Sequence, residues 1–89
     1  MVSRQKQVDE EALADLAYRK LNLGRDAWLV ECFPFPSSGH VSVRTTDVRA
    51  GRHVDRNVAY RTAAELEPAF LSAVSESVAE LRRSGGDRT

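Results

Sequence analysis

Four side chains are the candidates for a reactive group, and their sequence context favours a structural role over a catalytic one. Cys32, the single cysteine, can be paired on paper with His40 or His53, and Asp55 can orient an imidazole two residues away. A reactive thiolate needs exposure and a neighbouring positive charge. Cys32 instead belongs to the apolar run 27–33, where a free cysteine is typically a small buried hydrophobe. We therefore expect no catalytic residue and no enzymatic activity.

Metal and phosphate chemistry has no better support in the residue spacing. The chain has no paired-cysteine motif and no two histidines one helical turn apart, so we expect no metal site. Its five glycines are dispersed and form no loop that would cradle phosphates. A chain of 89 residues also leaves little room for a substrate pocket. The sequence therefore predicts no cofactor.

Arginine has the least ordinary distribution of any residue type. Thirteen basic and thirteen acidic residues cancel over the chain, but residues 40–61 carry a net +3 and residues 62–83 a net −2. The arginines of the basic segment are Arg44, Arg49, Arg52, Arg56 and Arg61. Such a segment can contact phosphates or an acidic protein surface. The alternative is that these charges protect a strand edge against pairing with another sheet.

Five elements must position these side chains. Residues 9–22 carry apolar residues at helical spacing behind Asp9, which suits an N-cap. Three short runs rich in branched and aromatic residues are typical of strands, and their short, turn-rich connections indicate an antiparallel meander. The strands are expected at residues 27–33, 40–46 and 53–61, with turns at 34–39 and 47–51.

The final helix has a broad apolar stripe and ends near Arg83, but its start is ambiguous. Thr62 and Glu65 have the spacing of a capping box, which favours a start directly after Thr62. Pro68 would then lie in the helix interior, at a cost of roughly 3 kcal/mol. We therefore expect a turn first, and a helix with Pro68 in its first turn.

This element order predicts an α+β fold, α-β-β-β-α, in which two helices pack on one face of a three-stranded antiparallel sheet. Residues 9–83 would form this single domain, residues 1–8 a flexible segment, and residues 84–89 a disordered tail. The row expected to face the helices is Val41, Val43, Val54, Val58 and Tyr60.

The element order resembles that of the double-stranded RNA-binding domain over most of the chain. In that family, a basic cluster at the start of the second helix contacts phosphates. The corresponding stretch here, residues 62–68, contains Glu65 and Glu67 and no basic residue. The turn after the first strand also lacks a basic residue, apart from His40 at its end. The resemblance therefore implies the arrangement of elements alone.

The first predicted strand has two apolar rows. If Trp28 and Val30 enter the core, Leu29 and Phe33 come out on the open face of the sheet, next to Phe35. One interpretation is that these are scattered surface residues, which are common. The other is a patch that docks another chain or a second copy.

The sequence as a whole predicts a small non-enzymatic regulator, inhibitor or adaptor that binds a protein through its sheet face and arginine-rich hairpin. The alternative is a module that binds RNA or DNA through the same arginines. The small core and two-faced first strand also predict a homodimer. The lone cysteine, the polar amino terminus and the lack of a long apolar run favour a cytoplasmic location away from membranes. The candidate contact residues are Leu29, Phe33, Phe35, Arg44, Arg49, Arg52, His53 and Arg56.

Overall fold

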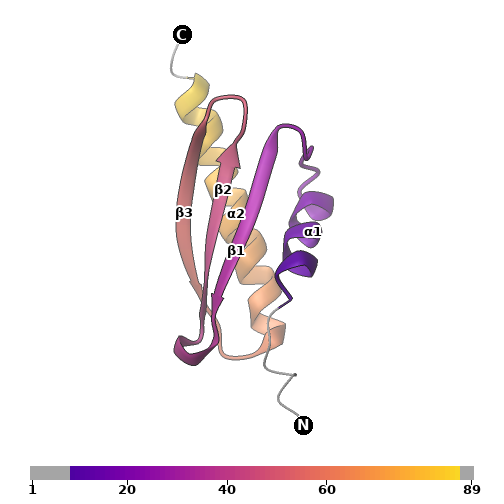
Figure 1. Cartoon of the computed structure of the whole chain (residues 1–89), viewed down its shortest axis with the longest axis vertical. Helices are drawn as coiled ribbons and strands as arrows, with labels where there is room; N and C mark the ends of the chain where they lie inside the picture. The colour runs from indigo at the N-terminus through magenta and orange to yellow at the C-terminus, as the bar shows by residue number, and fades with distance from the viewer. Residues whose placement is uncertain (1–8, 87–89) are drawn as a thin grey trace.

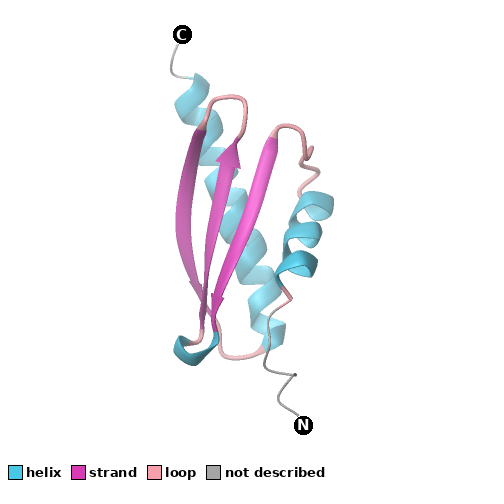
Figure 2. Ribbon diagram, in the orientation of Figure 1, coloured by secondary structure: helices cyan, strands magenta, loops and turns pink. Residues whose placement is uncertain are grey.

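The computed structural model describes residues 9–86 and gives the element order α1-β1-β2-β3-α2 (Figure 1). The strands form one antiparallel sheet in the order β1-β2-β3, and both helices lie on the same face of it (Figure 2). The predicted α+β fold is therefore confirmed. No helix within residues 9–86 combines the length and apolar character needed to cross a membrane. The elements are α1 (Glu10–Lys20), β1 (Trp28–Phe35), a 3-10 turn (Pro36–Ser38), β2 (His40–Asp47), β3 (Arg52–Ala59) and α2 (Ala63–Gly86).

The core lies between the covered face of the sheet and the two helices. α2 contributes the fully buried Phe70 and Val74 and packs against β2 and β3, whereas α1 packs against β1. The row predicted to face the helices is confirmed, because its members are buried or half-buried against this core. These residues are Val41, Val43, Val54, Val58 and Tyr60.

The predicted start of the last helix is wrong, because α2 begins directly after Thr62 and contains Pro68. The Thr62 hydroxyl accepts the Glu65 N–H at 3.3 Å, and the Glu65 carboxylate accepts the Arg61 N–H at 2.9 Å. The early start also buries Leu66 in the core. A cap contributes about 1 kcal/mol and a buried leucine about 1.5–3 kcal/mol, which together offset the cost of the proline.

The predicted turn at residues 34–39 is too long, because Pro34 and Phe35 belong to β1. Pro34 lies opposite Val41 of β2. A proline is tolerated in an edge strand when its nitrogen faces away from the neighbouring strand, since no ladder hydrogen bond is lost. The remaining turn closes at Gly39, whose φ of 70° is the left-handed conformation that glycine adopts most easily.

The last helix extends further toward the C-terminus than expected. α2 continues through Gly86, so residues 84–86, expected in a loose tail, are helical. Residues 1–8, expected to be a flexible segment, and residues 87–89 lie outside the described part of the chain.

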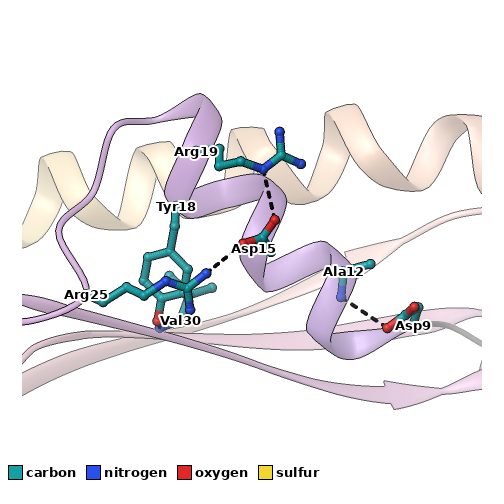
Figure 3. Close-up of polar contacts among 7 residues, drawn as sticks. All are labelled: Asp9, Ala12, Asp15, Tyr18, Arg19, Arg25 and Val30. Carbon is teal, nitrogen blue, oxygen red and sulfur yellow. Dashed lines mark hydrogen bonds and ion pairs between the residues drawn. The ribbon is translucent and has the colours of Figure 1, made fainter.

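A tyrosine of α1 closes part of the outer edge of β1. The Tyr18 hydroxyl accepts the Val30 N–H at 2.9 Å, in a buried position (Figure 3). The Arg25 guanidinium lies 4.0 Å from the centre of the Tyr18 ring and donates to Asp15 at 2.7 Å. These contacts fix the ring over the strand, so α1 satisfies a backbone amide that no other strand reaches.

Replacing Tyr18 by phenylalanine removes this acceptor and leaves the Val30 amide buried without a partner. We expect the free energy of unfolding to fall by about 1–3 kcal/mol, measured by urea denaturation. Tyr60→Phe is the matched control, because Tyr60 is half-buried and its hydroxyl makes no hydrogen bond among residues 9–86. Equal stability of the two variants would show that the Tyr18 hydroxyl does not stabilise the edge.

Candidate functional site

The uncovered face of the sheet is a grid of side chains in four cross-strand rows. Its register follows from the pairing of β1 with β2 and of β2 with β3, which alternates the two faces along each strand. From one end of the sheet to the other, the rows are Leu29–Thr46–His53, Glu31–Arg44–Asp55, Phe33–Ser42–Asn57 and Phe35–His40–Ala59. We call this grid the open face.

A charged row crosses the open face. Arg44 donates from Nε to Asp55 at 2.8 Å and from a terminal nitrogen to the other carboxylate oxygen at 3.3 Å. This two-point hydrogen bond holds the pKa of Asp55 below its usual value and raises the pKa of Arg44. Glu31 lies on the other side of Arg44, and His53 Nε2 lies 3.9 Å from Asp55. Arg44 is therefore neutralised by its neighbours.

An apolar row runs along β1 and is crossed by the charged row at Glu31, which separates Leu29 from Phe33 and Phe35. Leu29, Phe33 and Phe35 are 43%, 44% and 45% exposed, although all three are large and apolar. The Phe35 ring also stacks on His40, with ring centres 5.0 Å apart. Trp28 and Val30, the sequence neighbours of Leu29, are buried in the core, as the alternation requires. The open face therefore has an apolar side over β1 and a polar side over β3.

The structure does not bring the predicted arginines together. Arg56 lies in the covered row and donates to Ser77 at 2.9 Å and to Glu80 at 2.8 Å, with Glu76 at 3.6 Å. Arg49 lies in the turn between β2 and β3, 3.6 Å from Asp26, and both side chains are largely exposed. Arg52 is exposed at the start of β3.

The alternation of β3 contains the signal that places Arg56, because this residue stands between Val54 and Val58 of the covered row. The net charge of a sequence segment adds together residues, such as Arg44 and Arg56, that lie on opposite faces of the sheet. Sequence reasoning also omits Glu31 and His40 from the candidate contact residues. Only the register shows that Glu31 flanks Arg44 and that His40 lies against Phe35.

The sheet separates Cys32 from both histidines. Cys32 is buried on the covered face, and its thiol lies 3.4 Å from the Glu10 carbonyl of α1. Burial, and secondarily the charges of Glu10 and Asp9, raise the pKa of the Cys32 thiol to about 11. His40 and His53 are on the open face. Within residues 9–86, no group of three or more histidine, cysteine, aspartate or glutamate side chains is placed to hold a metal ion.

Comparison with protein-family models, with curated proteins and with solved structures finds no match to this chain.

Replacing Arg44 by glutamine is expected to raise the pKa of Asp55 toward the ordinary aspartate value of about 3.9. Because the folded-state pKa is lowered, the pair stabilises the fold above the ordinary aspartate pKa. This contribution is lost as the pH falls through the folded pKa. The measurement is an NMR titration of the Asp55 carboxyl carbon, with Arg49→Gln as the control. An unchanged titration in Arg44→Gln would mean that the pair does not form in solution.

The Cys32 thiol is expected to react slowly in the folded protein. Raising its pKa from 9.0 to about 11 lowers the thiolate fraction near neutral pH by about 100-fold. Modification by a chromogenic disulfide should therefore be at least about 100-fold slower in native buffer than in denaturant. Similar modification rates in native buffer and in denaturant would mean that the Cys32 thiol is reactive in the folded protein.

Proposed function

We propose that this chain is a non-enzymatic binding domain, a regulator, inhibitor or adaptor, which docks a protein partner on its open face. The observation that carries the proposal is the exposed row of Leu29, Phe33 and Phe35 beside the polar side of the same face. Contact surfaces of proteins combine an apolar or aromatic centre with a hydrogen-bonding rim. A cytoplasmic location, expected from the single cysteine, belongs to the same proposal.

The rows of the open face supply different kinds of contact to a partner. Phe33 and Phe35 are aromatic side chains of the kind that most often anchor a partner, because they bury a large area with little loss of conformational freedom. Ser42 and Asn57 lie in the same row as Phe33 and supply hydrogen-bond donors and acceptors. In the neighbouring row, the Arg44–Asp55 pair offers the hydrogen-bond donors and acceptors that the two groups do not use on each other.

A protein partner fits this charge distribution better than a nucleic acid. Exposed aromatic side chains on a sheet can stack on bases, but such sites also need unpaired cations along the path of the phosphates. Arg44 is held by Asp55 and flanked by Glu31, and Arg56 points to the other face. A phosphate chain over the open face would thus meet more negative than positive charge. The nucleic-acid alternative depends on Arg49 and Arg52 at the β2–β3 end.

We expect the paired substitution of Phe33→Ser with Phe35→Ser to weaken retention of the partner from extracts of the native host by at least about tenfold. The matched control is Val48→Ser, because Val48 is equally exposed but lies in the turn after β2. Far-UV circular dichroism checks that each variant is folded. Retention should survive nuclease treatment.

The opposite pattern would establish the nucleic-acid alternative. Retention would then disappear on nuclease treatment and fall steeply with rising salt. It would also be lost when Arg49→Glu is combined with Arg52→Glu, while the phenylalanine variant would bind as before. Equal retention by the phenylalanine variant and the Val48→Ser control would remove the open face from consideration.

A further inference from the structure

We propose that the outer edge of β3 pairs with the same edge of a second copy of this chain, joining two sheets into one antiparallel sheet of six strands. The inference rests on a contrast between the two edges of the sheet: β1 is closed to a further strand and β3 is open. It does not depend on what the open face binds.

The edge of β1 is closed by its own chain. The Val30 N–H donates to Tyr18 and not to β2, so the even-numbered residues of β1 point their backbone groups outward. The first of these, Trp28, donates its N–H to the Gly24 carbonyl at 3.0 Å. The last, Pro34, has no N–H to offer. Of the four outward-facing residues of β1, two therefore have an N–H that is already bonded, and one has no N–H.

The edge of β3 has no such cover among the described residues. The Tyr60 N–H donates to Gly39 at 3.1 Å, on the β2 side, so the odd-numbered residues of β3 point outward. His53, Asp55, Asn57 and Ala59 are all exposed, and no hydrogen bond from their backbone amides is found within residues 9–86. An uncovered edge of this length is a template for another strand.

The side chains of β3 complement themselves when the second strand is centred on Arg56. In this register, Val54 of each copy lies opposite Val58 of the other copy on the covered face. Because the two copies are related by symmetry, this valine pair occurs twice. On the open face, Asp55 lies opposite Asn57, a carboxylate against an amide. Branched apolar pairs and hydrogen-bonding pairs are the cross-strand combinations that stabilise antiparallel sheets.

Neighbouring registers are less favourable. Centring the pair on Asp55 places two aspartates opposite each other, and centring it on Val54 places Arg52 opposite Arg56. Like charges directly opposite one another destabilise a sheet. Centring it on Asn57 sets Arg56 against the apolar Val58. The register centred on Arg56 also places two like charges opposite each other, the two Arg56 side chains, but it alone combines the two Val54–Val58 pairs with the two Asp55–Asn57 pairs. We therefore infer that β3 favours this register.

The meeting of two Arg56 side chains at the centre is compensated by α2. An inward-pointing charge on an edge strand ordinarily prevents pairing. Here the Arg56 guanidinium bonds to Ser77 and Glu80 and lies 3.6 Å from Glu76, so two carboxylates counter one positive charge. Two such clusters side by side contain two arginines and four glutamates, and each guanidinium can be shared between copies.

A groove between β3 and α2 favours a whole second copy over an isolated extended peptide. Its lining on the strand side is Arg56, Asn57, Val58 and Ala59, and on the helix side it is Glu76 and the three small residues Ala69, Ser72 and Ala73. Small side chains let helices approach to about 8 Å, so the two α2 helices can pack while the strands pair. A lone peptide would satisfy the strand edge and leave this side of α2 uncovered.

The test is sedimentation of the full chain up to high micromolar concentration, where we expect a dimer in place of the 9.9 kDa monomer. Asn57→Pro deletes one outward N–H without touching the ladder to β2, and should weaken the dimer by at least about tenfold. Asn57→Ala keeps this N–H and loses only the side-chain pairs with Asp55, so it should weaken the dimer clearly less than Asn57→Pro does. Far-UV circular dichroism confirms that both variants are folded.

The register is tested on the unchanged sequence. A sample mixed from isotope-labelled and unlabelled chains should show intermolecular contacts between the α-protons of Val54 and Val58. A wild-type monomer at high micromolar concentration would overturn the proposal. A dimer that survives Asn57→Pro but is lost with Phe33→Ser and Phe35→Ser would also overturn it, because the open face would then be the contact.

Discussion

Both helices of this chain pack on the same face of the three-stranded sheet, so the other face is left uncovered. Phe70 and Val74 of α2 lie in this layer over β2 and β3, and Leu13 and Ala17 of α1 lie in it over β1, so this layer holds the buried apolar area. The strands alternate, so every residue that enters this layer sends its neighbours outward. Burying Trp28 and Val30 thus obliges Leu29 and Phe33 to remain exposed. The apolar row of the open face is the consequence of one-sided packing.

Much of the architecture could be predicted because local patterns and tertiary packing agree. The alternation of β2 identifies Val41 and Val43 as core residues, and Asp9 caps α1 as its position suggests, accepting the Ala12 N–H at 3.1 Å. The errors occur where a local rule competes with a long-range contact. Pro68 disfavours an early start of α2, but the burial of Leu66 and the Thr62 cap outweigh that preference.

The candidate site could be predicted less completely, because it depends on which residues face each other across strands. The position of Phe33 and Phe35 on one face follows from alternation alone. That Glu31, Arg44 and Asp55 form one row depends on the hairpin geometry, including Gly39 and Gly51, both with φ of 70°. For the same reason, the sequence does not show that two of the arginines have different roles. Arg44 balances charge on the open face, whereas Arg56 ties β3 to α2.

Because Cys32 lies beneath α1, its thiol can report how often the fold opens around that helix. The sulfur is buried and contacts the Glu10 carbonyl in the first turn of α1, so separation of that helix from the sheet would expose it to a reagent. Where such openings are brief, the rate of modification is proportional to their equilibrium population. Timed alkylation of this single atom would therefore report the openings of the fold around α1, without any change to the sequence.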